Sequence, residues 1–343
     1  MIEDIAQKEA LVKKPLVTFA VFAYNQEKFI TEAVEAAFAQ TYQPLEIIIS
    51  DDGSSDKTYE IIISLVRRYQ GPHIVRAIQT ESNEGILRHI LSVVNKSHGD
   101  LIVVAAGDDI SEPNRVSSLF EAWKSTGSWA LTSRFTRINE AGTIVSVNCV
   151  SEMRKNEIRD YFADGQSMIF IHGATAAYDR RSFKLLHHNH AGVINEDGLM
   201  TFLLHSNRKC VSLVEQSLIK YRSHSSSLSN SNLLESNTEQ IFSSEMRGSE
   251  FASKFINLNK LFLNISDELA KVDPDSYRNI IVDNIKKQMK FYVIRGSWIS
   301  TGFSARMKFL FSSFRWQDIR WMLPRIFGIE FFIKLKLLIA RLK

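Results

Sequence analysis

The nine residues from Leu101 to Asp109 read LIVVAAGDD, and this stretch decides the fold. Its first six residues are all apolar, which is typical of a strand that is buried on both faces of a parallel sheet. Gly107 ends the run, and two adjacent carboxylates, Asp108 and Asp109, follow it. Open α/β sheets bind their ligands at the carboxyl ends of parallel strands, so these acids lie where a ligand is expected.

The two acids of this stretch can serve different purposes. Because side chains alternate along an extended chain, one carboxylate can hold a ribose or anchor the loop while the other reaches a metal. Carboxylate oxygens suit Mg²⁺ or Mn²⁺, and such ions usually bridge to the phosphates of a substrate. The alternative is a polar strand-to-loop junction that caps the next helix.

Strands and helices alternate before this stretch. Runs of apolar and β-branched residues predict strands at 16–23, 45–50 and 74–79. Apolar residues at helical spacing predict helices at 27–40, 61–69 and 83–94. Such alternation predicts βαβ units and a mostly parallel sheet flanked by helices, an α/β fold.

The chain continues with less regular elements. A helix is expected just after Pro113, and a loop runs into a helix over 194–206. Further strands are expected at 129–134, 143–148 and 211–221. The domain organisation that we predict is a lead-in at 1–14, an α/β domain at 15–232 and a helical region at 233–343.

Composition excludes several classes of protein. The chain has 343 residues, 45% of them apolar and 23% charged, as in ordinary globular proteins. A formal net charge of +4 argues against a nucleic-acid binder. The two cysteines, Cys149 and Cys210, are far apart, so we expect reduced core thiols and no disulfide framework.

The sequence also bears on location. Acids near the N-terminus argue against a signal peptide, and no run of eighteen apolar residues occurs, so we expect a cytoplasmic protein. The basic and apolar tail at 326–343 has two interpretations. One is a packed helical subdomain, and the other is peripheral contact with the inner membrane, which would suit a lipid-linked acceptor.

Three acidic pairs fall at the ends of predicted strands or in loops, and they are Asp51/Asp52, Asp108/Asp109 and Glu196/Asp197. The strand ends of a parallel sheet share one rim, so these carboxylates should converge, and Arg88 and His224 could join them. Without a cation, such acids would repel and raise one another's pKa. A divalent ion with a diphosphate ligand would relieve the repulsion. The residues thus indicate a metal-assisted site for a nucleotide diphosphate.

An ordered set of short motifs carries a family resemblance. The motifs are Phe22-Ala23-Tyr24-Asn25, Asp51-Asp52-Gly53-Ser54-Ser55-Asp56, Asn83-x-Gly85, Gly107-Asp108-Asp109, Glu196-Asp197 and Tyr221-Arg222-x-His224. In this order, they make residues 15–229 resemble the family-2 inverting glycosyltransferases of the GT-A (Rossmann-like) fold. The resemblance is closest to bacterial enzymes that build surface polysaccharides. No motif in the helical C-terminal third takes part.

The resemblance implies roles at the donor nucleotide. The loop after the first strand would hold the base and its sugar through Ala23, Tyr24 and Asn25, with Glu27 steadying the loop. Asp52 would read the uracil or thymine edge. Arg88 would contact the diphosphate, although a helix surface charge is the simpler interpretation. Asp51 and Asp56 read as turn and cap residues.

The resemblance also implies the metal and catalytic residues. Asp109 would bind Mn²⁺ or Mg²⁺ directly, and Asp108 would hold ribose or a metal-bound water. His224 would lie near the diphosphate and the metal. Asp197 would be the catalytic base, with Glu196 orienting the acceptor. The plain alternatives are a helix N-terminal acid at Asp197 and an exposed loop histidine at His224.

The expected function is metal-dependent, inverting transfer of a sugar from a UDP-sugar or dTDP-sugar donor. The acceptor would be a hydroxyl of a glycan or lipid-linked glycan in bacterial surface polysaccharide synthesis, such as O-antigen or capsule. Two alternatives stay open. One is a Mg²⁺-dependent phosphatase or nucleotidyltransferase, and the other is a non-catalytic scaffold that binds a nucleotide-sugar. The cluster His187, His188 and His190 reads as a solvated loop.

Overall fold

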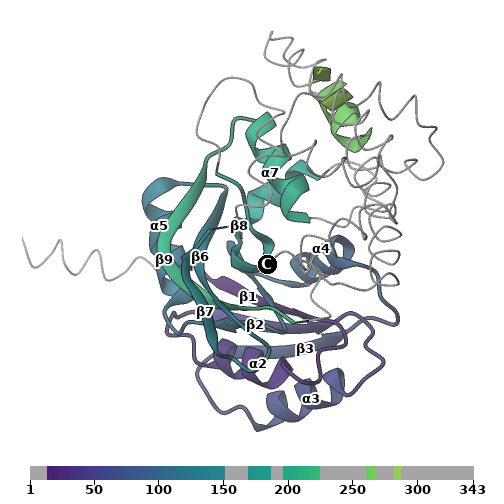
Figure 1. Ribbon diagram of the computed structural model, residues 1–343, viewed down its shortest axis with the longest axis vertical. Coiled ribbons are helices and arrows are strands. Elements are labelled where there is room, and N and C mark those ends of the chain that lie inside the picture. Colours follow the sequence, from purple (N-terminus) through teal and green to yellow (C-terminus); the bar gives the residue numbers. More distant parts are fainter. Residues whose placement is uncertain are drawn as a thin grey trace, which may run out of the picture. The chain divides into compact units, whose positions relative to one another are not determined.

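The computed structural model describes residues 14–150, 169–186, 196–224, 260–267, 282–283 and 285–286. The chain divides into two compact units, Met1–Asn230 with Ile265–Ile281, and Ser231–Asn264 with Val282–Lys343. All elements named below belong to the first unit (Figure 1). The basic tail, the cluster at His187 to His190 and most of the helical region lie outside the described residues, so those interpretations stay predictions.

The first half of this unit is a regular alternation of strands and helices. Its elements are β1 (Val17–Ala23), α2 (Ile30–Phe38), β2 (Leu45–Asp51), α3 (Thr58–Arg68), β3 (Ile74–Gln79), α4 (Ile86–Lys96) and β4 (Leu101–Ala106). Each predicted element of this region is present, with shifted ends. Helix α4 begins three residues later than predicted because Gly85 has a φ of +82° and Asn83 Oδ1 accepts its N–H, which makes a turn.

The second half is less regular. Its elements are β5 (Ile110–Ser111), α5 (Arg115–Thr126), β6 (Ala130–Ile138), β7 (Ile144–Cys149), the 3₁₀ turn η1 (Gly173–Thr175), β8 (Ala177–Asp179), the 3₁₀ turn η2 (Arg180–Leu185), α7 (Glu196–Ser206) and β9 (Val211–Arg222). The sequence predicted the longer elements, but not β5 or β8. Both are too short to show a hydrophobic period.

The described strands form one mixed sheet in the order β3-β2-β1-β4-β8-β6-β9-β5, with β7 on β6. β3, β2, β1 and β4 are mutually parallel, as the apolar runs predicted. Beyond β4 the directions mix, because β8 is antiparallel to both β4 and β6. β6 and β9 then pair in parallel. Because the strand direction reverses at β8 and again at β6, β9 ends at the same rim of the sheet as β4.

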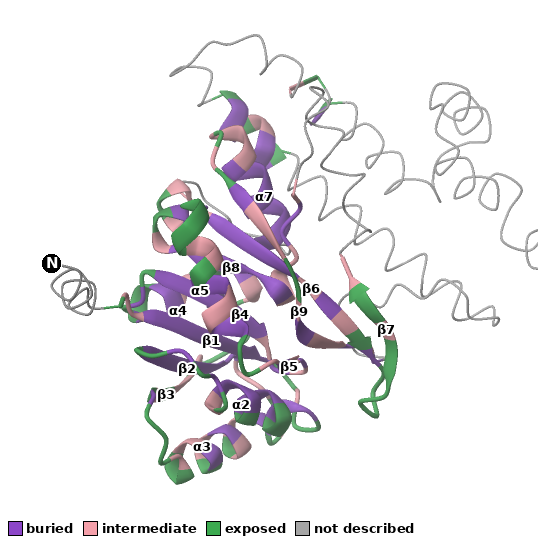
Figure 2. Ribbon diagram, turned by 90° about the vertical axis from the view of Figure 1, so that its left-hand side faces the viewer, coloured by how far each residue is buried: buried purple, intermediate pink, exposed green. Residues whose placement is uncertain are grey.

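The core lies on and around the parallel half of the sheet, where every residue of β1 and β2 is buried (Figure 2). Helix α2 adds Ile30, Ala33 and Val34 to this core at helical spacing. The prediction that both thiols lie in the core is wrong, because Cys210 is exposed and Cys149 is only half-buried. Both thiols are free, as expected.

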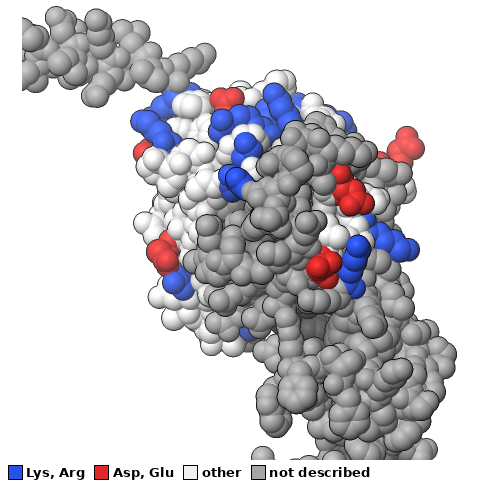
Figure 3. All heavy atoms as spheres, turned by 90° about the horizontal axis from the view of Figure 1, so that it is seen from above, with Lys and Arg blue, Asp and Glu red and all other residues white. Residues whose placement is uncertain are grey.

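The surface carries more basic than acidic side chains on the face in Figure 3, where Lys and Arg gather over part of the described residues. Trp129, just before β6, has two cations near its ring, with Lys209 Nζ 4.5 Å and Arg181 Cζ 5.1 Å from the ring centroid.

Among the described residues, no helix combines the length and the apolar composition that a bilayer crossing requires.

A buried carboxylate fixes the rim opposite the expected site. Glu46 of β2 accepts hydrogen bonds from the Thr18 hydroxyl and from the backbone N–H groups of His98 and Gly99. It also pairs with Arg76 at 3.0 Å. Burial raises the pKa of Glu46, but these hydrogen bonds to the ionised form outweigh burial and lower the pKa overall.

Replacing Glu46 should therefore reduce stability in a pH-dependent way. We expect Glu46→Gln to lower the free energy of unfolding by about 1.5–3 kcal/mol at pH 7, because hydrogen bonds to a charged group are lost. A lowered pKa stabilises the fold above the unfolded value of about 4.3, and this contribution disappears as the pH falls through the folded value. Urea titrations at pH 7 and near pH 4 measure the difference. Glu60→Gln, at an exposed position of α3, is the matched control, and equal effects of the two changes would contradict the assignment.

Candidate active site

The loops after β1, β2 and β4 meet at one rim of the sheet. Strand β1 lies between the other two, with Ala23 beside Asp51 and Phe22 beside Ala106. Two hydrogen bonds extend the pairing past the strand ends, since Asp52 N–H donates to Ala23 O at 2.9 Å and Gly107 N–H donates to Phe22 O at 2.8 Å. The acidic ends of β2 and β4 therefore flank the end of β1.

The loop after β1 is bound to the loop after β2. Asn25 Oδ1 accepts the Ser55 N–H at 2.9 Å, and the Asn25 N–H donates to Ser54 Oγ at 2.8 Å. Asn25 has a φ of +51°, a region that asparagine tolerates better than most residues. Tyr24 is 46% exposed beside this contact. The loop thus has a fixed backbone and an exposed aromatic side chain.

Glu27 and the acids of the second loop complete this connection. Lys57 N–H donates to Glu27 Oε2 at 3.1 Å, and Glu27 N–H donates to Asp56 Oδ2 at 3.1 Å. Asp56 also accepts the Thr58 N–H at the start of α3, and Asp51 accepts hydrogen bonds from Ser54. The turn and cap roles predicted for Asp51 and Asp56 are confirmed, and Glu27 fastens its loop.

Asp52 is buried and held by the N-terminal turn of α4. Its Oδ1 accepts the Thr80 hydroxyl at 3.1 Å and the Glu84 N–H at 3.0 Å. Its Oδ2 accepts the Gly85 N–H at 3.1 Å, which leaves Oδ2 with room for another donor. Backbone N–H groups at a helix N-terminus stabilise a negative charge. These contacts hold the Asp52 carboxylate in one orientation.

His89 adjoins Asp52, and the sequence did not identify it as a site residue. Its Nε2 lies 2.5 Å from Ser50 Oγ, and its Nδ1 lies 4.0 Å from Asp52 Oδ2. Burial lowers the pKa of His89, although the nearby Asp52 opposes the shift. The imidazole is therefore neutral at pH 7. The sequence feature that could have identified His89 is its position on the apolar face of α4, between Leu87 and Ile90.

Asp108, Asp109 and His224 come together at the ends of β4 and β9. His224 Nε2 lies 2.9 Å from Asp108 Oδ2. Asp109 Oδ1 accepts the backbone N–H of Arg222 at 2.8 Å, whereas its buried Oδ2 has no hydrogen-bond partner. Burial, and then the charge of Asp108, raise the pKa of Asp109 well above its ordinary value. The structure brings these three residues together, and their roles at a metal stay predictions.

Two buried arginines support this rim. Arg222 donates from Nε to Asp108 O at 2.9 Å, and its guanidinium lies 5.0 Å from the Phe29 ring. Arg115 donates to Val104 O at 2.6 Å and to Ala174 O at 2.9 Å, so it holds η1 beside β4. Burial lowers the pKa of Arg115 to about 10, and Asp109 opposes that shift. Arg115 therefore remains a cation at pH 7.

Glu196 and Asp197 begin helix α7 and are buried. Asp197 accepts the Gly198 N–H at 2.7 Å and the Gly173 N–H at 3.2 Å, which joins α7 to η1. A Cβ on Gly173 would lie 2.3 Å from Glu196 Oε1, so a larger residue there would displace the end of the Glu196 side chain. Since Arg115 fixes η1 beside β4, Asp197 is linked through η1 to the strand that precedes Asp109.

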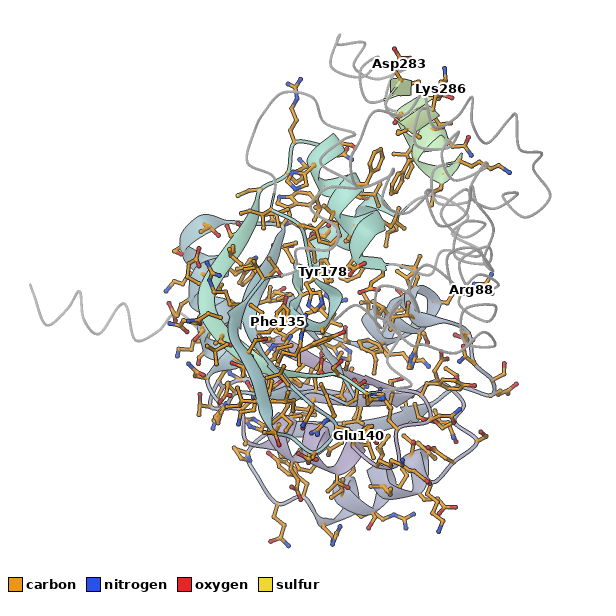
Figure 4. The ribbon with its side chains drawn as sticks, in the orientation of Figure 1. Arg88, Phe135, Glu140, Tyr178, Asp283 and Lys286 are labelled. Carbon is orange, nitrogen blue, oxygen red and sulfur yellow. The ribbon has the colours of Figure 1, made fainter. Side chains whose placement is uncertain are left out.

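Tyr178 of β8 is a further buried group (Figure 4), for which the sequence leaves open a place in the acceptor cleft or at a helix start. Its hydroxyl has no hydrogen-bond partner. Burial, followed by the charges of Glu196 and Asp197, raises the pKa of Tyr178 well above its ordinary value. The phenol therefore stays protonated near the two acids of α7. Arg88, by contrast, is exposed on α4 (Figure 4), and its contact with a diphosphate stays a prediction.

The described residues supply part of the coordination that a divalent cation needs, and not all of it. Within the ranges that the structure describes, no three His, Cys, Asp or Glu side chains already surround a point where a metal ion could bind. The buried and unpartnered Oδ2 of Asp109, next to the half-buried Asp108, is nevertheless suited to a hard cation. Mg²⁺ and Mn²⁺ sites often use one or two carboxylates, with substrate phosphates and water completing the coordination. The donor set fits that arrangement.

Comparisons with known proteins agree with this geometry. The description Glycosyl transferase family 2 matches residues 18–186, which include the loops after β1, β2 and β4. Chondroitin synthase of Escherichia coli is 33% identical over 141 residues, which are 41% of this chain and 20% of that protein. The chain spans less than two-fifths of the length of the curated relatives that it matches.

Two solved structures share the fold at low identity. TarS 1-349 of S. aureus, in complex with UDP-GlcNAc, has a TM-score of 0.56 at 15% identity over 90% of this chain and 81% of that chain. The mannosyltransferase PcManGT of Pyrobaculum calidifontis, in complex with GDP-Man and Mn²⁺, has a TM-score of 0.52 at 12% identity over 92% and 85%. The fold is that of GT-A glycosyltransferases, and residues 18–186 of the chain form a glycosyltransferase domain of family 2.

Proposed function

We propose that the protein transfers a sugar from a UDP-sugar or dTDP-sugar to a hydroxyl of a glycan or lipid-linked glycan in bacterial surface polysaccharide synthesis. The observation that carries the proposal is the meeting of three loops at one rim, with Asp52 on one side of β1 and Asp108-Asp109 on the other. A nucleotide diphosphate has a base at one end and phosphates at the other, and this rim offers suitable groups for both. The family match supports the reaction class.

The donor base would be recognised at Asp52. The N3–H of uracil or thymine is a donor, and Asp52 Oδ2 can accept one more hydrogen bond. Ala23, Tyr24 and Asn25 would lie along the base and its sugar, and the bonds from Asn25 and Glu27 to the second loop keep that surface in place. Thr80 and the turn at Glu84 and Gly85 hold the Asp52 carboxylate in one orientation, which favours binding at low entropic cost.

The diphosphate end would be held at Asp109, Asp108 and His224 with Mn²⁺ or Mg²⁺. When bound, such an ion supplies Lewis-acid stabilisation of the leaving diphosphate. Asp109 Oδ2 is the direct ligand in this proposal, because its other oxygen is already bonded to Arg222 N–H. Asp108 would contact the ribose or a water of the ion. PcManGT carries Mn²⁺ together with its nucleotide sugar, which supports the choice of ion.

The acceptor hydroxyl would lose its proton to Asp197. Two backbone N–H groups orient this carboxylate at the start of α7, and Glu196 beside it would orient the acceptor. Attack on the anomeric carbon from the face opposite the diphosphate inverts its configuration. The proton goes to Asp197, and the electron pair of the broken bond leaves with the diphosphate. Arg88 would contact the diphosphate if the bound donor lies close to helix α4.

The two alternatives are less well supported. A phosphatase that forms an aspartyl-phosphate needs an aspartate after the first strand, where β1 is followed by Tyr24 and Asn25. A non-catalytic nucleotide-sugar scaffold would bind the donor equally well. A measurement of sugar transfer to an acceptor distinguishes such a scaffold from an enzyme. The domain boundaries at 15–232 and 233–343, a cytoplasmic location and a peripheral membrane contact belong to this proposal as predictions.

Nucleotide-dependent thermal stabilisation tests the donor assignment. UDP, dTDP, GDP and CMP are each added with and without Mn²⁺, and the melting temperature is recorded. We expect a rise with UDP or dTDP that is larger in the presence of Mn²⁺, because a ligand that binds only the native state stabilises it. No rise with any of the four nucleotides would refute the proposed donor class.

Asp109→Asn tests the metal ligand. The substitution removes a buried charge whose second oxygen has no partner, so the metal-free protein should be as stable as the wild type or more stable. The additional stabilisation by UDP with Mn²⁺ should disappear, while stabilisation by UDP alone persists. Differential scanning fluorimetry measures all three values. Asp100→Asn, an exposed change just before β4, is the control, and a retained Mn²⁺ effect in Asp109→Asn would remove Asp109 from the metal site.

Asp197→Asn tests catalysis against scaffolding. We expect UDP affinity to be unchanged and transfer to fall roughly 10²–10⁴-fold, the usual contribution of a general base. The measurements are UDP binding by calorimetry and acceptor-dependent UDP release from a UDP-sugar with an oligosaccharide mixture. Glu215→Gln, an exposed acid on β9, serves as the control. Transfer at the wild-type rate would show that Asp197 is not the base.

A further inference from the structure

Arg222 is one of the most deeply buried cations of the described residues, and its side chain contacts three separate segments. Its Nε donates to Asp108 O at 2.9 Å, one terminal nitrogen donates to Glu140 O at 2.9 Å, and the other pairs with Glu32 Oε2 at 3.0 Å. Glu140 lies in the turn between β6 and β7 (Figure 4), and Glu32 lies on α2. The guanidinium therefore joins the acidic loop, the β6–β7 turn and α2.

The main chain of the same residue also contacts the acidic loop. Arg222 N–H donates to Asp109 Oδ1 at 2.8 Å, so main chain and side chain hold both members of the Asp108-Asp109 pair. The peptide between the two acids is thereby fixed, and with it the directions of both carboxylates. Asp109 Oδ2 is left as the free oxygen, and Asp108 Oδ2 faces His224.

Phe29 completes this arrangement from the side of α2. Its ring lies 5.0 Å from the Arg222 guanidinium and 4.7 Å from the His224 ring. Phe29 follows the loop of Tyr24 and Asn25 by a few residues, just before α2 begins. The segment that would hold the donor base and the cluster that would hold its diphosphate are thus packed on the same arginine.

The geometry suits arginine in particular. A guanidinium presents donors in a planar fork, and here three different nitrogens reach acceptors in three directions. A lysine ammonium is a single point on a flexible stem and cannot occupy all three positions at once. Since the side chain is 2% exposed, a lost contact is not replaced by bulk water.

We propose that Arg222 is the positioning residue of the divalent-cation site. It sets the orientation of Asp108, Asp109 and His224 and touches neither nucleotide nor cation. The inference rests on the proposed function, because it assumes that a cation and a nucleotide diphosphate meet at Asp109. Groups that orient metal ligands commonly change metal affinity by about 10–100-fold when they are replaced, although they contribute no coordinating atom.

The test separates metal-dependent from metal-independent binding. Arg222→Lys, Arg222→Met and the milder Glu32→Gln are compared with the wild type by calorimetry. Uridine without metal reports the base pocket, UDP with Mn²⁺ reports the complete site, and Mn²⁺ electron paramagnetic resonance with UDP present reports the metal directly. Arg180→Lys is the matched control, because Arg180 also donates three hydrogen bonds, to Gly99 O, Val94 O and Ser97 Oγ, at the opposite rim.

For Arg222→Lys and Arg222→Met we expect Mn²⁺ affinity in the presence of UDP to fall by about 10–100-fold, with uridine affinity unchanged. Glu32→Gln should give a smaller loss, because Glu32 is half-exposed and only one contact weakens. Arg180→Lys should lower the melting temperature without altering Mn²⁺ affinity.

Two results would overturn the inference. If uridine and UDP–Mn²⁺ affinities fall together in the Arg222 variants, or if Arg180→Lys has the same effect, Arg222 serves only the general fold. If the Arg222 variants do not fold, wild-type Mn²⁺ affinity in Glu32→Gln overturns it instead. A wild-type protein that binds neither UDP nor Mn²⁺ overturns the proposed function as well, whereas normal wild-type binding with unaffected variants removes the inference alone.

Discussion

The hydrogen bond from Arg222 N–H to Asp109 Oδ1 connects the last residue of β9 to the acid that follows β4. It is the constraint on which the candidate metal site depends. One oxygen of the Asp109 carboxylate accepts a backbone hydrogen bond, and this bond fixes the direction in which the other oxygen points. Because Asp109 is buried, its unpartnered oxygen destabilises the ionised form, as the raised pKa of Asp109 reflects. The cation of the proposed function would offset that cost.

The three acids of the proposed mechanism are stabilised in different ways. Asp52 is held by the N–H groups of Glu84 and Gly85, and Asp197 by those of Gly173 and Gly198. Dipoles of this kind stabilise a carboxylate without an ion. Among the residues that the structure describes, Asp109 Oδ2 is a buried oxygen without a hydrogen-bond partner. The contacts of Asp52 and Asp197 therefore do not depend on a cation, and the proposed function assigns the cation to Asp109.

The sequence predicted what depends on local pattern. The apolar runs at β1, β2 and β4 defined buried parallel strands, and the acids after them fell on the shared rim. It could not predict the mixed half of the sheet, because β8 has only three residues and β6 pairs with a β9 that lies far along the chain. His89 and Arg115 were missed because their contacts arise from tertiary partners, and an isolated buried polar residue has no sequence signature of its own.

Under the proposed function, the two halves of the sheet contribute different parts of the donor site. The parallel half supplies the loops of Asn25 and Asp52 on its own, through contacts between β1, β2 and α4. His224 and Arg222 reach the rim only because β9 pairs in parallel with β6, and η1 reaches it only because Arg115 bonds to Val104 O and Ala174 O. In the proposed site, base recognition is therefore local to the first hundred residues or so, whereas the groups proposed for the diphosphate and the acceptor depend on long-range pairing. Related chains could accordingly keep the first part while varying the second, since changes beyond β4 leave the contacts around Asp52 intact.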